Sequence, residues 1–313
     1  MKSYIYGPVP SRRLGRSLGV DLVPFKVCSY DCIYCQLGRT RDKTIEQRPY
    51  IPAGKILDQF AQKLKNKIHA DYITIAGSGE PTLNSEIGPI IREIKKISTI
   101  PVAVLTNGSL LWKKELRESI MEADVIMPSL DAFDQNGFET INRPHPDIKF
   151  ADMLEGLICL GNEYAGEIWL EIFVLDGINA TEKDAKKFGN LIKEINPKKV
   201  HINTAVRPAA ETYANQVSQK DLAVFCECLG VNAEIITPYI ASENDKKAEI
   251  DIENNILALI ARRPCTLDDI ASSLNVHRNE VLKFITPMVK KQNIKTTKKG
   301  TEIYYESSIL DVH

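Results

Sequence analysis

The chain has 313 residues, 43% of them apolar and 26% charged, a composition typical of a globular protein with room for one large and one small domain. No run of about 18 apolar residues occurs, and no basic stretch precedes an apolar core at the N-terminus, so neither a transmembrane helix nor a secretory signal is expected. The net charge of −1 excludes a chain-wide attraction to nucleic acid or to an anionic membrane. Seven cysteines, an odd number, favour reduced thiols in a cytoplasmic protein.

Strand-like and helix-like runs alternate through the first three quarters of the chain. The strand-like runs are rich in valine and isoleucine and mostly free of charge, as in strands that are covered on both faces. They span Leu18–Val23, Asp71–Ala76, Pro101–Thr106, Val125–Leu130, Ile168–Leu175 and Lys199–Ala205. The alternation predicts an α/β fold in which a parallel sheet is surrounded by helices, a partial (β/α)6 TIM-type barrel. In such barrels the functional residues gather at the carboxyl ends of the strands.

A second, smaller domain is predicted at the C-terminus. The polar segment Ser242–Lys247 reads as a linker between a domain of residues 1–242 and one of residues 248–313. The predicted elements of the small domain are the helices Ile252–Ile260, Thr266–Leu274 and His277–Lys291 and the strands Ile294–Thr297 and Glu302–Tyr305. Three helices followed by a hairpin are typical of a winged helix-turn-helix.

Three cysteines lie close together after the first predicted strand. Cys28, Cys32 and Cys35 have the spacing C-x3-C-x2-C. Thiolates bind zinc or iron–sulfur clusters. A structural zinc site needs a fourth ligand, which only a distant Cys or His could supply here. Three thiolates on a four-iron cluster leave one iron open to bind a reactive ligand. Spacing alone leaves both alternatives open.

The cysteine segment and a second motif carry a family resemblance. The segment resembles the signature C-x3-C-x-aromatic-C of radical S-adenosylmethionine (SAM) enzymes, with Tyr34 as the aromatic residue. Ile75–Thr82 resembles the glycine-glycine-glutamate-proline motif of that superfamily, with Ser78 where the first glycine is usual. Polar residues follow the third and fourth strands in the order expected of the family. The resemblance covers roughly residues 1–240.

The resemblance implies the cofactors and their contacts. Cys28, Cys32 and Cys35 would ligate a 4Fe–4S cluster whose fourth iron chelates S-adenosylmethionine. An electron from the cluster, delivered by a partner such as flavodoxin or ferredoxin, would cleave the cofactor to a 5′-deoxyadenosyl radical that abstracts hydrogen from a substrate. The residues expected to contact the cofactor are Tyr34 near the adenine, Gly77, Gly79 and Glu80 at the ammonium, Asn107, Ser129, Asp131, Glu171 and Asn203.

Several arginines are candidates for anion binding. Gly7–Arg16 resembles an uncharacterised subfamily related to the archaeal wyosine synthases, which act on a guanosine of transfer RNA. The segment that ends Cys35–Gly38 departs from the synthase pattern, so their substrate does not carry over. Arg12, Arg13 and Arg16 are expected either to hold an anionic substrate or the cofactor carboxylate, or to form a solvated basic turn. Arg207 follows the sixth strand and could bind a carboxylate or phosphate.

The other cysteines have ordinary interpretations. Cys159 lies in an apolar run and is expected to pack in the core. Cys226 and Cys228 are two positions apart on a predicted helix, so they do not share a face, which disfavours a second cluster. Cys265 precedes a helix and is expected to be partly exposed.

The small domain carries a local excess of six positive charges between residues 262 and 299. That charge suits a winged helix that binds RNA or DNA, while a protein-docking or lid domain is the alternative. The sequence therefore favours a radical SAM enzyme acting on a nucleoside, RNA or small molecule, with a transfer-RNA nucleoside as one candidate. The alternatives are an activase or modifying enzyme for a partner protein and a non-catalytic, metal-bearing DNA-binding regulator. A regulator would not need the motif at Gly77–Glu80.

Overall fold

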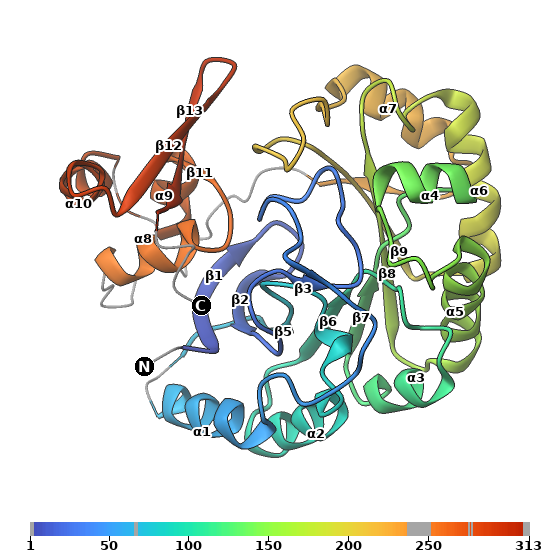
Figure 1. The fold of residues 1–313 in the computed structure, drawn as a ribbon, viewed down its shortest axis with the longest axis horizontal. Helices are drawn as coiled ribbons and strands as arrows, with labels where there is room; N and C mark the ends of the chain where they lie inside the picture. The colour runs from blue at the N-terminus through green and yellow to red at the C-terminus, as the bar shows by residue number, and fades with distance from the viewer. Residues whose placement is uncertain (1–2, 66–67, 237–251, 275, 277, 309–313) are drawn as a thin grey trace.

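The computed structural model describes residues 3–65, 68–236, 252–274, 276 and 278–308. One curved sheet of eight strands, in the order β1-β2-β5-β6-β7-β8-β9-β10, dominates the fold (Figure 1). Its strands are β1 Ile5–Ser11, β2 Gly15–Val20, β5 Tyr72–Ile75, β6 Val102–Thr106, β7 Val125–Pro128, β8 Glu167–Val174, β9 Lys199–Thr204 and β10 Glu234–Ile235. All neighbours pair in parallel except β1 and β2, which form an antiparallel hairpin.

Within the described residues 3–65 and 68–236, seven helices and a short 3-10 helix, η1, connect the strands. They are α1 Ala53–Leu64, η1 Pro81–Leu83, α2 Ile87–Ile97, α3 Lys114–Ile120, α4 Gln135–Ile141, α5 Phe150–Glu163, α6 Glu182–Ile195 and α7 Gln219–Cys228. The helices form an arc around the outside of the sheet (Figure 1). Helix α6 begins at a capping box made by Thr181 and Asp184 and ends at Asn196 in the left-handed conformation.

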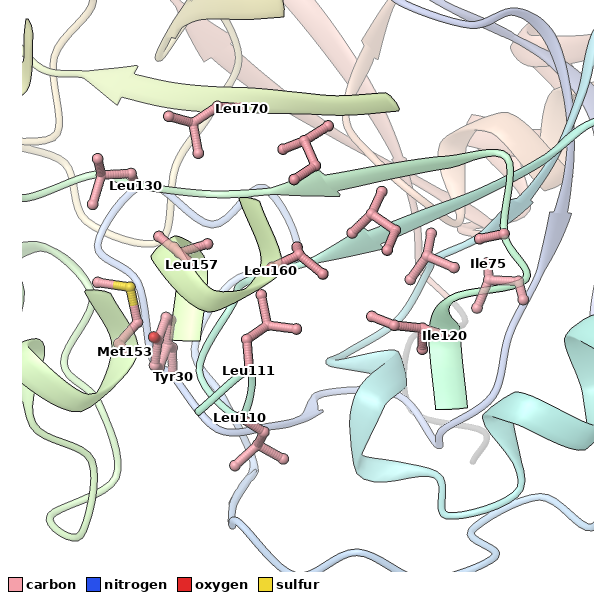
Figure 2. Packing of buried hydrophobic residues seen from close by; sticks show 14 of the residues in the cluster. Tyr30, Ile75, Leu110, Leu111, Ile120, Leu130, Met153, Leu157, Leu160 and Leu170 are labelled. Atoms are coloured by element: carbon pink, nitrogen blue, oxygen red, sulfur yellow. The ribbon is translucent and has the colours of Figure 1, made fainter. Parts of the chain in front are cut away.

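The main core lies between the sheet and these helices. Figure 2 shows Leu157 and Leu160 of α5 gathered with Leu130, Leu170 and the Leu110–Leu111 pair. The sheet positions are apolar on both faces because helices cover one side and the curved interior the other. The six predicted strands correspond to β2 and β5–β9, so the mostly parallel α/β sheet is confirmed.

Strand β1 was not predicted. Its sequence holds Pro8 and Pro10, which cannot donate to a strand ladder and argue against a strand in the middle of a sheet. The sheet order places β1 at an edge, where prolines are tolerated. The hairpin also moves the start of the next strand back, so β2 begins at Gly15, before the predicted Leu18.

Residues 252–308 form a C-terminal unit with its own core. It contains α8 Ile252–Ile260, β11 Cys265–Thr266, α9 Leu267–Leu274, α10 Arg278–Lys290, β12 Ile294–Lys299 and β13 Glu302–Ser307. The three strands form an antiparallel sheet in the order β11-β13-β12, and α8 lies beside β1 (Figure 1). The predicted linker Ser242–Lys247 and His277 lie outside the described residues. The prediction that Cys265 is partly exposed is wrong. Strand β11 places Cys265 in the core of the unit, where it has no exposed surface. Within the described ranges, none of the helices has the length and apolar character that crossing a membrane requires.

A histidine in β9 gives the fold a pH dependence. His201 is buried, and burial, together with Arg13 and Lys199, lowers its pKa to about 4. The unfolded chain therefore takes up this proton at higher pH than the folded chain does, so stability is full above the ordinary pKa of about 6.5 and falls as the pH drops towards 4.

We expect this histidine to remove about 1–2 kcal/mol of stability between pH 7 and pH 5. Urea unfolding at the two pH values should show that His201→Gln loses less stability than the parent protein. His69→Gln, at an exposed position, is the matched control and should behave like the parent. Equal acid sensitivity in His201→Gln and the parent would contradict the assignment.

Candidate functional site

The three clustered cysteines lie on a loop that other elements hold in place. The loop starts at β3 Val27–Cys28, which pairs in parallel with β4 Asp42–Lys43. Its middle is fixed to the end of α4, where the amide of Ile33 donates to the carbonyl of Ile141 at 2.9 Å. The amide of Cys35 donates to the carbonyl of Cys32 at 3.1 Å, which closes a tight turn. Backbone hydrogen bonds within the chain therefore hold the loop at its start, in its middle and at the third cysteine.

Each of the three thiols has a nitrogen donor from a different segment. Asn107 Nδ2 lies 3.6 Å from Cys28 Sγ, Asn142 Nδ2 lies 3.5 Å from Cys32 Sγ, and Lys26 Nζ lies 3.2 Å from Cys35 Sγ. Donors of this kind stabilise thiolates and tune iron–sulfur clusters. Three thiols with separate donors fit a cluster held at three corners.

The electrostatics of the thiols also favour a cationic ligand. Burial, reinforced by Glu80, raises the pKa of Cys28 to about 12, and burial with Asp131 raises the pKa of Cys32 well above its usual range. Iron bound by these residues would supply the positive charge that keeps such thiols deprotonated.

The segment Gly77–Glu80 follows β5 and is bonded to the start of the cysteine loop. The amide of Lys26 donates to the carbonyl of Ser78 at 2.6 Å, and the amide of Glu80 donates to the carbonyl of Val27 at 3.1 Å. A Cβ atom on Gly79 would lie 1.9 Å from the Val27 carbonyl oxygen, so only glycine permits this approach. The two motifs that carried the family resemblance are thus one continuous structure.

Glu80 is bonded entirely within the chain at this edge. Its Oε1 accepts from the amide and hydroxyl of Thr82 and from Thr106 Oγ1, and its Oε2 accepts from the amide of Asn107 at 2.7 Å. It is 2% exposed, and burial raises its pKa. Glu80 therefore ties the end of β5 to the end of β6, and its predicted contact with the ammonium stays a prediction.

These bonds predict that Glu80→Ala damages the fold as well as the site. The substitution leaves four donors on Thr82, Thr106 and Asn107 without their acceptor, which should lower the free energy of unfolding by roughly 2–4 kcal/mol. Thermal melting should show a drop of several degrees. Glu118→Ala, on the exposed face of α3, is the control and should melt like the parent protein. An unchanged melting temperature for Glu80→Ala would show that the network is not formed.

Tyr34 and Asp131 belong to a second buried network. The Tyr34 ring stacks on Phe173 at 3.9 Å between centroids, and its hydroxyl donates to Asp131. Asp131 also accepts from Asn142 Nδ2 at 2.8 Å and from the amide of Phe173 at 3.0 Å. Because Asn142 also contacts Cys32, this network joins the cysteine loop to β8. Ser129 lies next to it, half-buried, in a bridge with Glu171.

The hairpin between β1 and β2 brings two arginines to predicted site residues. Arg13 pairs with Glu171, and Arg12 Nη2 donates to Asn203 Oδ1 at 3.2 Å. Arg16 lies elsewhere, with its Nε directed to the carbonyl of His69 at 3.3 Å. The structure therefore separates the basic turn into two arginines directed at the sheet and one at the surface.

Sequence reasoning missed four residues at the site, two of which, Asp21 and Arg262, form an ion pair. Arg262 of the C-terminal unit pairs with the buried Asp21, donates from Nη1 to Ser78 Oγ at 2.8 Å, and lies over the Tyr6 ring at 3.8 Å. A separation of 241 residues between Asp21 and Arg262 left no local signal. The contact gives a reason for Ser78, since a glycine there would offer Arg262 no side-chain acceptor. Lys26 and Asn142 were also missed.

Comparison with known proteins agrees with this geometry. Residues 22–189 match the model of the radical SAM superfamily. A UPF0026 protein of Methanocaldococcus jannaschii is 34% identical over 316 residues, which cover 97% of this chain and 96% of that protein. A Brachyspira hyodysenteriae protein named GTPase Obg is 35% identical over 293 residues; the match covers 93% of this chain but spans only 43% of that protein's length.

Among solved structures, the structure of TYW1 with a lysine–pyruvate adduct has a similar fold. Its TM-score is 0.51 at 18% identity, over 70% of this chain and 74% of that one. The chain therefore belongs to the radical SAM superfamily, together with the UPF0026 proteins, and its cofactors are a 4Fe–4S cluster and S-adenosylmethionine.

Proposed function

We propose that this protein is an enzyme in which Cys28, Cys32 and Cys35 ligate the cluster and the adjoining segment Gly77–Glu80 holds S-adenosylmethionine. The observation that carries the proposal is the pair of backbone bonds between Lys26–Val27 and Ser78–Glu80, which sets the two motifs side by side. When bound, the cofactors supply reductive cleavage of S-adenosylmethionine to a 5′-deoxyadenosyl radical, which abstracts hydrogen from the substrate.

The residues of the chain have distinct proposed tasks. Gly77 and Gly79 let the backbone approach the methionine part of the cofactor, while Glu80 and Asp131 position the loops that surround it. Asn107 and Lys26 donate to cysteine sulfurs and set the electronic environment of the cluster. The remaining proposed cofactor contacts are Tyr34, Ser129, Glu171 and Asn203.

We further propose a division into two domains, residues 1–242 as a partial (β/α)6 barrel and residues 248–313 as a winged helix that selects the substrate. The basic charge of the second domain favours an RNA substrate, with a nucleoside of transfer RNA as the leading candidate. The fold similarity to TYW1 and the resemblance of Gly7–Arg16 to relatives of the wyosine synthases support that candidate. Flavodoxin or ferredoxin is the proposed electron donor.

A test uses anaerobically purified full-length protein, reconstituted with iron and sulfide. It should hold about four irons and cleave S-adenosylmethionine to 5′-deoxyadenosine under reduction. The same protein is then incubated with transfer RNA, peptides and metabolite mixtures, and each pool is screened for mass changes. A change confined to transfer RNA supports the proposal, and one confined to a peptide supports the activase alternative. Stoichiometric zinc without iron would overturn the radical function and favour the metal-bearing regulator.

A further inference from the structure

A cavity of about 410 Å³ lies between the sheet and the C-terminal unit. Three guanidinium groups line it, from the hairpin turn (Arg12), from the loop after β9 (Arg207) and from the loop between α8 and β11 (Arg263). Its neighbour, a cavity of about 320 Å³, shares Arg263 and is lined on the other side by Gln36–Gly38, which follow the third cysteine. The arginine cavity is therefore next to a second cavity, which reaches the segment after the cysteines.

The most unusual group in this cavity is Arg207. It is 5% exposed, yet its Nε and Nη1 have no hydrogen-bond partner in the described part of the chain. Its Nη2 lies 3.4 Å from Asp269 Oδ1, at the long end of a hydrogen bond. Asp269 is also engaged in capping α9, where its Oδ2 accepts from the amide of Thr266 at 3.1 Å. Burying a guanidinium with unpaired N–H groups is costly unless a ligand completes it.

The position of Arg207 is fixed from the C-terminal unit. Lys299 Nζ donates to the carbonyls of Ala205 at 2.8 Å and of Arg207 at 3.0 Å, and the Tyr304 hydroxyl donates to the carbonyl of Val206 at 2.9 Å. Three successive carbonyls are thus held by one hairpin. These hydrogen bonds fix the backbone of the loop after β9, so the Arg207 side chain has a defined position.

The charges around the cavity leave the arginines short of counter-ions. Burial and the neighbouring guanidiniums lower the pKa of Arg12 to about 9, so it remains protonated at neutral pH. Of the carboxylates on the wall, Asp268 is paired with Arg278 at 3.0 Å, Glu302 is exposed, and Asp269 is shared with the cap of α9. Three arginines, of which Arg207 is buried and the other two are half-buried, thus line a space whose nearest carboxylate, Asp269, is already partly engaged.

We propose that this cavity is an oxyanion site that binds a phosphate group of the substrate. A phosphate monoester carries up to two negative charges and a phosphodiester carries one, and the tetrahedral oxygens of either group can accept from several guanidiniums at once, whereas a carboxylate offers two oxygens in one plane. That the cavity binds phosphate does not depend on the proposed function. That the phosphate belongs to the substrate does. It narrows that substrate to phosphorylated molecules, either a small phosphate ester or the backbone of RNA.

The test measures binding of inorganic phosphate, a nucleoside 5′-monophosphate and a short single-stranded RNA to the full-length protein by calorimetry. Saturable binding that weakens at least tenfold in Arg207→Gln is expected. Arg92→Gln, at an exposed position on α2, is the matched control and should bind like the parent protein. Asp269→Asn removes the competing carboxylate and should tighten binding several-fold, a gain that misfolding cannot produce.

The relative affinities distinguish the sources of the phosphate. Tightest binding of the mononucleotide indicates a small phosphorylated substrate, and tightest binding of RNA indicates its backbone. No saturable binding of any probe, equal binding by Arg207→Gln and the parent, or tighter binding of citrate than of phosphate would overturn the site. Cleavage of S-adenosylmethionine is measured on the same samples to separate the two proposals. A protein that binds phosphate but does not cleave S-adenosylmethionine counts against the radical function and leaves the phosphate site standing.

Discussion

Replacing any one of Cys28, Cys32 and Cys35 by serine is expected to remove the iron–sulfur cluster and, with it, cleavage of S-adenosylmethionine. Each thiol is the proposed ligand of a different iron. A serine variant leaves the cluster only two thiolate ligands, which are too few to hold it. Iron content should fall from about four per chain to near zero, and the visible absorbance should vanish. The loss of 5′-deoxyadenosine production should be at least a thousandfold, on the order of 4 kcal/mol in activation free energy.

The control for this experiment is Cys159→Ala, at a half-buried position on α5. It should keep full iron content and lose at most a little stability. Because the cysteine loop is bonded to α4 and to Ser78–Glu80 through its backbone, the serine variants should still fold. A serine variant that retains four irons and activity would show that the cluster is held elsewhere in the chain.

Loss of Arg262 is expected to have the second largest effect. Arg262→Met leaves the Asp21 carboxylate buried beside Ser78 without its cation, and breaking a buried pair in this way costs roughly 3–5 kcal/mol. The affinity for S-adenosylmethionine should fall too, because Ser78 lies between the two glycines proposed to meet the cofactor. Thermal melting and cofactor titration, on the same preparation, measure the two effects.

A double-mutant cycle makes the cause specific. The double variant, Asp21→Asn with Arg262→Met, removes both charges. It should therefore regain much of the stability that Arg262→Met alone loses. Arg278→Met, which breaks the exposed pair with Asp268, is the control and should cost less than about 1 kcal/mol. Additive losses from Asp21→Asn and Arg262→Met would contradict a direct interaction between them.

Local pattern was sufficient to predict most of the sheet. The six parallel strands are apolar runs covered on both sides, and the cysteine and glycine motifs follow β2 and β5, where a parallel sheet gathers its functional residues. Strand β1 was missed because its prolines are permitted only at an edge, and a single strand does not reveal its neighbours. Cys265 was misplaced because its burial depends on pairing of β11 with β13.

The roles of polar side chains were harder to predict for the same reason. Glu80 and Asp131 are both predicted to contact the cofactor, and that stays a prediction. The structure adds that each is bonded within the chain to residues on neighbouring strands and loops. Those bonds depend on how closely the next strand approaches, which a single strand does not reveal.

The sequence by itself indicated the superfamily and its cofactors, because two short motifs resemble those of the family, and Cys28, Cys32 and Cys35 are the cluster ligands that this resemblance predicts. Only the tertiary structure decided that Arg262 contacts Asp21 and Ser78, and that Arg12, Arg207 and Arg263 surround one cavity. Those groups come from a hairpin, a strand end and a separate C-terminal unit. These groups interact because folding brings their charges close together in a buried region. Their distant positions in the sequence follow no periodic pattern that would predict this.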